Sequence, residues 1–517
     1  MNKFKEILTI KGTSDILPDE YDRYDILKNK IKNCFESFGY RGIDVPIMEY
    51  SELHLKKSGP DIISKLYAFK DYGNRNICLR PELTASVVRA FVNELSNNPL
   101  PIRLYYFGPA FRYDNPQENR YRQFTHAGIE LIGTDTPISD AEVIYLAYKG
   151  LELLDLSNFR IVIGHIGFVL ELLDNLELDD RVKSFFLQYI EELSKQKDLN
   201  FIKEKLKNLD LWVPHAEDSK KKLDNEEFIS HIENIGYTAA EKIILGMLDE
   251  INIGLDGNRD PKEIAEHLIN KIRRRNQRKN IGKALEFIEK LSQIKGKPPE
   301  IFDDIKSIIN YFKLDKGPLE ELKLVTSNLN FFNIDWDKVT VNLGFGRGLE
   351  YYTGIIFEIY YDKLGKENQI CGGGRYNSLV RTLGGKRDVP ALGFAYGLER
   401  IKSSLNIEKK LEGEIKSTDI FIIPIGHNSL DYAIKISELL RNTGLKIELD
   451  VNERKVPRSL EYADKVNIPF SLLVGEEEKR SKTLKLRNMK TKNEQIIKLS
   501  ELNKIDNFLK EKIKVDK

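Results

Sequence analysis

Apolar residues recur at helical spacing near the start of the chain, namely Ile26, Leu27, Ile31 and Phe35. This pattern predicts a helix over Pro18–Phe38 that ends at the glycines of Gly39–Gly42. The apolar run Ile43–Met48 that follows predicts a strand. Pro46 inside this run favours a sheet edge or a subunit contact over the centre of a sheet, because proline has no N–H to donate.

Apolar and polar residues alternate in residues 102–108 and 122–133. Alternation with a period of two predicts strands, and the polar segment Asn115–Asn119 between them predicts a loop. The two strands should therefore pair antiparallel, and residues 1–165 should mix helices with strands.

Helical periodicity dominates residues 166–325, with charged faces and few strand patterns. The predicted helices there are Asp180–Leu193, Glu241–Glu250, Pro261–Ile272 and Ile281–Gln293. Strand patterns return at Lys338–Leu343, Ile355–Tyr361 and Gln369–Gly373, and helices are predicted after them at Tyr376–Leu383 and Ala391–Leu405. We therefore interpret residues 166–325 as a helical insertion between two halves of one sheet domain, residues 1–165 and 326–405.

A charged linker at residues 406–416 precedes a change of pattern. Short apolar runs beyond it predict strands at Asp419–Ile425, Lys446–Leu449, Phe470–Val474 and Thr483–Arg487. Helices alternate with them at Leu430–Arg441, Val456–Lys465 and Ser500–Ile513. This order predicts a separate α/β domain at residues 417–517 with a largely buried sheet.

Composition narrows the class of protein. A chain of 517 residues with 41% hydrophobic and 31% charged residues is typical of a soluble globular protein of two to four domains. We expect no membrane span and no signal peptide, and hence a cytoplasmic location. The three cysteines lack CxxC spacing and the seven histidines do not cluster with them. Neither a disulfide framework nor a metal site built from protein ligands is therefore expected.

Three glycine-marked or aromatic-rich segments carry the candidate chemistry. Each holds an arginine: Phe111–Asp114 with Arg112, Gly346–Gly354 with Arg347, and Gly393–Arg400 with Arg400. The planar guanidinium group donates two parallel hydrogen bonds and so suits phosphate. Walker and Rossmann glycine spacings do not occur. The pattern therefore indicates an arginine-based phosphate site outside those folds. The net charge of +1 neither supports nor excludes nucleic-acid binding.

At these residues the chain resembles the class II aminoacyl-tRNA synthetases, and among them the histidyl-tRNA synthetase family. The matching segments are Leu79–Ala85, Phe111–Phe124, Arg347–Gly354, Cys371–Asn377 and Gly393–Arg400. The resemblance implies an α+β fold with an antiparallel-sheet catalytic core in residues 1–165 and 326–405. It also implies that residues 166–325 form the helical insertion and residues 417–517 an anticodon-binding α/β domain. Glu350, Leu83, His126 and Asn377 depart from the usual residues of the family.

The resemblance also implies roles for single residues. Arg112, Arg347 and Arg400 would be catalytic and contact ATP, which Asp114 and Phe124 would help to bind, with Mg²⁺ accompanying the ATP. L-Histidine would be held by a set of acidic, aromatic and polar side chains: Glu82, Thr84, His126, Glu130, Arg347, Tyr351, Tyr352 and Tyr376. A pocket that pairs both imidazole nitrogens rejects other amino acids.

The third implied partner is tRNA(His). Arg120 would reach its acceptor end, and Arg454, Lys455 and Arg458 its anticodon region. The basic run of the insertion, with Arg273, Arg274, Arg275 and Arg278, suits a tRNA backbone, although a solvated helix face fits it equally well. The resemblance also implies a homodimer in which Gly39–Glu49 packs across a two-fold axis.

Two other functions fit parts of the chain. Phe124–Gly133 and Gly164–Gly167 resemble the synthetase-like regulatory subunit of ATP phosphoribosyltransferase as much as they resemble the enzyme. That paralogue normally ends after the third arginine segment, whereas this chain continues. A tRNA-binding scaffold without activity would not need all three arginines. The sequence therefore favours an enzyme that joins histidine to tRNA(His).

Overall fold

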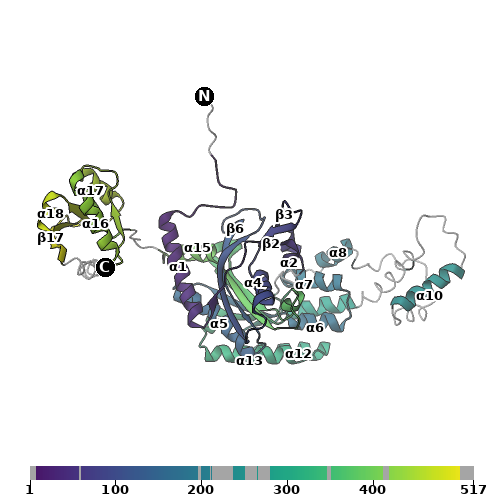
Figure 1. Cartoon of the computed structure of the whole chain (residues 1–517). Coiled ribbons are helices and arrows are strands. Elements are labelled where there is room, and N and C mark those ends of the chain that lie inside the picture. The colour runs from purple at the N-terminus through teal and green to yellow at the C-terminus, as the bar shows by residue number, and fades with distance from the viewer. Residues whose placement is uncertain are drawn as a thin grey trace. The chain divides into compact units, whose positions relative to one another are not determined.

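A computed structural model describes residues 7–56, 60–195, 200–209, 211, 237–250, 265, 280–345, 351–411 and 418–500. The chain divides into two compact units, Met1–Leu411 and Glu412–Lys517 (Figure 1). In the described part of the chain, no helix is both long enough and apolar enough to span a membrane.

A nine-stranded sheet forms the centre of the first unit. Its strands lie in the order β1-β5-β6-β12-β11-β10-β7-β9-β8. Their bounds are β1 Arg41–Gly42, β5 Ile102–Phe111, β6 Gln123–Ile132, β12 Ala391–Gly397, β11 Gln369–Arg375, β10 Ile355–Tyr360, β7 Arg160–His165, β9 Val339–Asn342 and β8 Lys295–Gly296. Neighbours from β5 to β7 pair antiparallel. This confirms the predicted pairing of β5 with β6 and the predicted class of fold.

Helices cover both faces of this sheet. On one face lie α1 (Pro18–Ser37) and α5 (Pro137–Leu153). Phe35 of α1 stacks on Tyr396 of β12, with ring centroids 6.3 Å apart. On the other face, Leu83 and Val87 pack with Leu104 and Tyr106 of β5 around α4 (Thr84–Ala90). Successive residues of a strand point to opposite faces, so β12 turns Tyr396 toward α1 and its neighbour Ala395 toward the α4 side.

The local sequence explains where α1 begins. Pro18 stands at the start of the helix, where its missing N–H costs nothing, and Asp19 and Glu20 complement the positive end of the helix dipole. Leu27, Ile31 and Phe35 are buried at intervals of four residues, as the predicted helix required.

The residues between β1 and β5 form a second, smaller antiparallel sheet, with strands in the order β2-β4-β3. Its strands are β2 Met48–Tyr50, β4 Asn76–Leu79 and β3 Tyr67–Lys70, and the helices α2 Ser51–Leu55 and α3 Pro60–Ser64 connect them. The predicted strand Ile43–Met48 is wrong, because β1 ends at Gly42 and β2 begins at Met48. The buried Arg80 donates hydrogen bonds to the carbonyls of Val45 and Pro46, so these carbonyls serve a guanidinium group instead of a strand.

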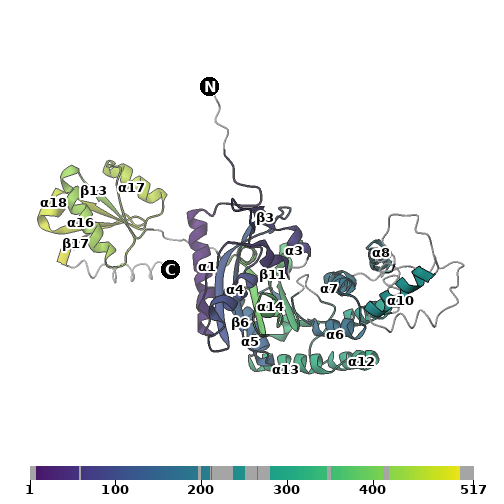
Figure 2. The same cartoon turned by 45° about the vertical axis from the view of Figure 1, so that its right-hand side comes forward.

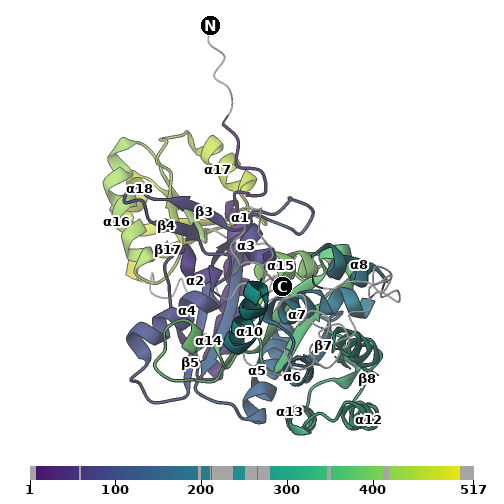
Figure 3. The same ribbon diagram turned by 90° about the vertical axis from the view of Figure 1, so that its right-hand side faces the viewer.

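The helical region contains α6 Gly167–Asn175, α7 Asp180–Lys195, α8 Asn200–Asn208, α10 Tyr237–Glu250, a helix over residues 280–292, and α12 Phe302–Phe312. Three predicted helices are thereby confirmed, and the fourth, Pro261–Ile272, lies outside the described residues apart from Ala265. Figures 2 and 3 show α6 and α12 close to α13 (Gly317–Phe331). α13 leads to Phe332, whose ring stacks on Tyr145 of α5 with centroids 4.9 Å apart. The end of this region thus packs on the helices of the large sheet.

The predicted helix Ala391–Leu405 is wrong in its first half. Residues Ala391–Gly397 form β12, and α15 covers Leu398–Ile407. The strand pairs with β6 on one side and β11 on the other, and a side chain at Gly393 would collide with the carbonyl of Ile129. Pairing on both edges overrides the helical pattern. The predicted helix Tyr376–Leu383 shrinks to α14, Leu379–Thr382, because the N–H of Tyr376 donates to Ala391 and keeps the backbone extended.

The second unit has a five-stranded sheet in the order β14-β13-β15-β16-β17. The strands are β14 Ile447–Leu449, β13 Ile420–Pro424, β15 Phe470–Val474, β16 Thr483–Asn488 and β17 Glu494–Lys498, and the helices are α16 Leu430–Arg441, α17 Val456–Lys465 and α18 Glu476–Ser481. Ile420 and Ile422 of β13 pack toward α16, whereas Phe421 and Ile423 pack toward α17. The sheet is therefore buried on both faces, as predicted, while the predicted helix Ser500–Ile513 lies beyond the described residues except for Ser500.

Candidate active site

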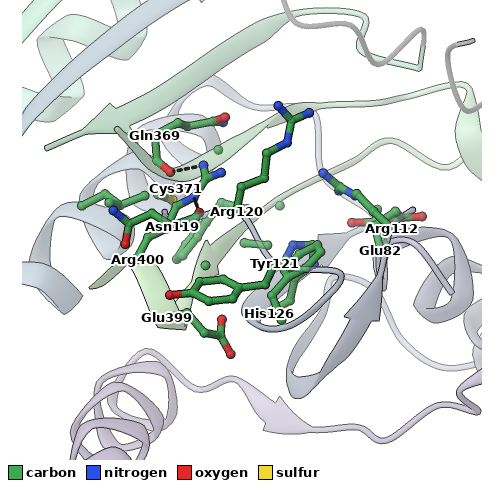
Figure 4. A pocket seen from close by; sticks show the side chains of 18 of the residues that line it. Glu82, Arg112, Asn119, Arg120, Tyr121, His126, Gln369, Cys371, Glu399 and Arg400 are labelled. Carbon is green, nitrogen blue, oxygen red and sulfur yellow. Dashed lines mark hydrogen bonds between the residues drawn. The ribbon is translucent and has the colours of Figure 1, made fainter. Parts of the chain in front are cut away.

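A pocket opens on the α4 side of the large sheet, where strands from both halves of the first unit meet. It is lined by eleven of the predicted site residues: Glu82, Thr84, Arg112, Asp114, Arg120, Phe124, His126, Tyr351, Tyr352, Tyr376 and Arg400. Figure 4 shows Arg112 beside Glu82, and Arg400 beside Asn119 and Gln369. The fold thus brings together residues that lie up to 318 positions apart, from Glu82 to Arg400. Arg347 lies outside the described residues.

One end of the pocket is cationic. Arg112 donates from Nε to the carbonyl of Pro81 at 3.1 Å, and its guanidinium carbon lies 5.2 Å from the centroid of the Phe124 ring. Arg400 donates from Nε to Asn119 at 2.9 Å and from Nη1 to the carbonyl of Gln369 at 2.8 Å. Backbone carbonyls therefore help to fix the planes of both guanidinium groups.

Asp114 moderates this cationic end. Its carboxylate pairs with Arg120 at 2.8 Å and with Lys65 at 3.5 Å. Burial opposes ionisation of Asp114, but the hydrogen bond from Arg120 and the nearby positive charges outweigh it and lower the pKa of this carboxyl. Asp114 is therefore an anion that orients Arg120 at the mouth of the β5–β6 loop.

Glu399 is a pocket residue that sequence reasoning did not assign. The backbone N–H of Thr125 donates to both of its oxygens at 2.9 Å, and the hydroxyl of Tyr24 donates to Oε1 at 3.1 Å. These bonds tie α15 to β6 and α1. The motif Gly397-Leu398-Glu399-Arg400 could have indicated this residue, because Glu399 directly precedes the predicted site residue Arg400. Asn119, Tyr121, Gln369 and Cys371 also line the pocket and were not assigned.

The other end of the pocket is acidic and aromatic. Glu130 is 1% exposed and is not itself a lining residue, but it accepts hydrogen bonds from the hydroxyls of Tyr106, at 3.1 Å, and of the lining residue Tyr376. Burial raises the pKa of Glu130 to about 8. The ring of Tyr351 meets Tyr376 edge-on at 5.7 Å between centroids. Only a glycine at position 393 leaves room for the Glu130 carboxyl group, which explains one glycine of the third segment.

Glu82 is a second buried carboxylate at this end. Its Oε1 accepts a hydrogen bond from the N–H of Ala85 at 3.0 Å, at the start of α4. Burial opposes its ionisation, yet the interaction with His54, followed by smaller contributions from Ala85 and His126, lowers its pKa. The ring of His126 packs edge-on against Phe124 with centroids 5.1 Å apart. The pocket therefore offers an anion for a cationic group and, farther along, arginines for an anionic one.

The remaining predicted contacts lie elsewhere. Arg454 donates to the buried Asp450 at 3.0 Å and stacks over Tyr462, with 4.5 Å from its guanidinium carbon to the ring centroid. Lys455 and Arg458 are exposed at the start of α17. The arginines at positions 273, 274, 275 and 278 lie outside the described residues.

Comparisons with known proteins agree with this geometry. A family model described as "Histidyl-tRNA synthetase" matches residues 12–230 and 261–401, and one described as "Anticodon binding domain" matches residues 419–510. The "Histidine--tRNA ligase" of Methanococcus maripaludis strain S2 is 33% identical over 95% of this chain and 98% of its own length. The corresponding protein of Pyrococcus furiosus is 32% identical over 95% of this chain and 97% of its own.

Solved structures show the same fold. Apo histidyl-tRNA synthetase from S. aureus is 25% identical with a TM-score of 0.64, and the match covers 97% of this chain and 99% of that one. A Bacillus halodurans structure titled "ATP phosphoribosyltransferase regulatory subunit/histidyl-tRNA synthetase" is 20% identical with a TM-score of 0.61, over 91% of this chain and 99% of that one. At that identity it shows a shared fold alone.

Proposed function

The chain belongs to the histidyl-tRNA synthetase family, and on that premise we propose that the pocket between β6, β11 and β12 is its active site. The protein is an aminoacyl-tRNA ligase: it activates L-histidine with ATP to histidyl-adenylate and transfers the histidyl group to tRNA(His). The observation that supports this location is that residues of all three arginine-bearing segments line one pocket. The buried carboxyl group of Glu82 lines the same pocket, and that of Glu130 accepts a hydrogen bond from the lining residue Tyr376.

At the cationic end we assign ATP. The histidine carboxylate attacks the α-phosphate, and negative charge grows on the phosphate oxygens as pyrophosphate leaves. Arg112 would bind the α-phosphate from one side and Arg347 from the other, and Arg400 would bind the γ-phosphate end. Phe124 would stack on the adenine, and Asp114 would hold Arg120 in place beside the nucleotide. Catalysis here is positioning plus cationic stabilisation, because both reactants are anions.

At the acidic end we assign histidine. Glu130 and Tyr376 would pair with the imidazole nitrogens, and Tyr351, Tyr352 and His126 would close the pocket around the ring. Glu82 and Thr84 would hold the α-ammonium group. Because the pKa of Glu130 lies at about 8 in the free protein, its carboxyl group is mostly protonated at neutral pH and so can donate to an imidazole nitrogen as well as accept.

Mg²⁺ would enter with ATP. Among the described residues, no cluster of three or more acidic, histidine or cysteine side chains could hold a metal ion alone. Phosphate oxygens would therefore supply most of its ligands. Glu399, which lines the same pocket and precedes Arg400 in the sequence, would be the protein carboxylate available to the ion. When bound, the ion would neutralise phosphate charge.

We assign tRNA binding to Arg120, to the second unit and to the insertion. Arg120 would face the acceptor end, and the second unit would bind the anticodon, with Lys455 and Arg458 as contacts. Arg454 would act mainly by shaping that surface, since Asp450 and Tyr462 already engage it. The insertion, with its run Lys271–Lys279, would grip the tRNA backbone. We also assign a homodimer through Gly39–Glu49 and a cytoplasmic location.

The regulatory-subunit alternative is less well supported. The match to an anticodon-binding family model over residues 419–510, and Arg112 and Arg400 lining one pocket, both favour the enzyme. ATP–pyrophosphate exchange with each of the twenty amino acids tests the assignment. Exchange with histidine alone is expected; exchange with a different amino acid, or with none, would contradict it.

A further inference from the structure

One buried histidine that does not line the pocket contacts a carboxylate that does. His54 lies on α2, is 1% exposed, and places its Nδ1 3.6 Å from Oε1 of Glu82. Neither ring nitrogen has a hydrogen-bond partner among the described residues. A buried polar group without a partner is costly, so a role for the imidazole should lie in its acidic neighbour Glu82.

The two carboxylate oxygens of Glu82 have different surroundings. Its carboxylate is 6% exposed and stands at the N-terminal end of α4, where the backbone N–H of Ala85 donates to Oε1. His54 approaches the same oxygen. Among the described residues Oε2 accepts no hydrogen bond, and Glu82 lines the pocket. The protein thus contacts Oε1 and leaves Oε2 for a ligand.

Other cations near this position have different partners. Arg80, 1% exposed, gives its N–H groups to the carbonyls of Val45, Pro46 and Pro109. Arg89 pairs with Glu49 at 2.9 Å. His126, by contrast, lies on the pocket side, where a substrate would displace or contact it. His54 is therefore the side chain placed to orient Glu82 without standing in the pocket.

We propose that His54 is a positioning residue that holds Glu82 ionised and turned toward the α-ammonium group of histidine. This inference rests on the proposed role of Glu82. At 3.6 Å the contact between Nδ1 and Oε1 is longer than a hydrogen bond, and a small approach of the ring when histidine binds would make it one. That bond would stabilise the negative charge of a carboxylate that burial otherwise disfavours, and it would fix the direction of Oε2. Without it, Glu82 would tend to hold a proton, and a protonated carboxyl group is a weak partner for an ammonium ion.

Two ligands distinguish this positioning role of His54 from a role in packing alone. Histidinol keeps the imidazole and the ammonium group, whereas 3-(imidazol-4-yl)propionate keeps the imidazole and lacks the ammonium group. In the full-length protein with His54→Leu, calorimetric titration should show about 10- to 100-fold weaker binding of histidinol, as expected for a lost hydrogen bond to a charged group. Binding of imidazolylpropionate should be nearly unchanged. His54→Gln retains an N–H donor and should recover much of the loss.

Controls keep the test decisive. Ser51→Ala alters another buried polar side chain of α2 and should leave both ligands unaffected. Equal weakening of both ligands in His54→Leu would reduce His54 to a packing role, and unchanged binding of both would overturn the proposal. Glu82→Gln tests the premise that Glu82 binds the ammonium group. If this variant binds histidinol as the wild type does, the assigned role of Glu82 is wrong. If Glu82→Gln weakens histidinol binding and His54→Leu does not, only the role proposed for His54 is refuted.

Discussion

Single residues of the pocket combine burial with specific hydrogen bonds, and Glu130 is the clearest case. Burial makes ionisation of its carboxyl group expensive, while the hydroxyls of Tyr106 and Tyr376 partly offset that cost. The result is a raised pKa of about 8. A group that titrates near neutrality in the folded protein couples the fold to pH.

This coupling has a definite sign. The pKa of Glu130 rises from 4.5 to about 8 on folding, so its contribution to stability is fully present below pH 4.5 and is lost as the pH rises through 8. The loss amounts to about 1.4 kcal/mol for each pKa unit of difference. Glu130→Gln, which cannot ionise, should flatten the fall in thermal midpoint of the first unit between pH 5 and pH 9. Parallel midpoint curves for variant and wild type would show that Glu130 ionises as freely as in the unfolded chain.

Arg112 should matter for the reaction more than for substrate binding. Its guanidinium group is oriented by Pro81 and Phe124 and is assigned to charge that grows in the transition state. Arg112→Ala should therefore lower kcat for pyrophosphate exchange by about 100- to 1000-fold, with a smaller change in the KM for histidine. Arg122→Ala is the matched control, because Arg122 stacks over Tyr113 and donates to the carbonyl of Asp114. Equal losses in the two variants would mean that Arg112 only supports the loop.

At the scale of elements, close strand packing builds the pocket. β12 is held between β6 and β11, and Gly393 faces both Glu130 and the carbonyl of Ile129. Gly393→Ala should displace the carboxyl group of Glu130, weaken histidine binding at least tenfold and lower the midpoint of unfolding, since backbone atoms cannot move aside as side chains can. Gly246→Ala in α10, where an added methyl group meets no atom of the described residues within 4 Å, should be neutral or stabilising by up to about 1 kcal/mol. Titration with histidine and thermal unfolding measure both effects.

Sequence patterns predict an element correctly where the periodic spacing of apolar residues lies within the element itself. The bounds of α17 follow the predicted Val456–Lys465, because apolar positions and Pro457 mark that helix locally. β12 was mistaken for a helix because its strand character comes from β6 and β11, which lie far away in sequence. The same limit applies to the site. Motifs gave Arg112 and Glu130, whereas His54 stands 28 positions before Glu82 with no pattern to join them.

At the scale of the whole molecule, the two units have separate cores. The residues that pack in the first unit and those that pack around β13 share no members. The unit Met1–Leu411 contains every described residue of the pocket. A chain ending at Leu411 should therefore fold and retain histidine-dependent pyrophosphate exchange, which needs no tRNA. Charging of tRNA(His) should fall by about 100-fold or more, because losing one of two linked binding sites removes the gain in effective concentration. Exchange and charging assays on the same preparation decide the matter: a comparable loss in both would mean that Glu412–Lys517 supports the catalytic unit rather than serving tRNA alone.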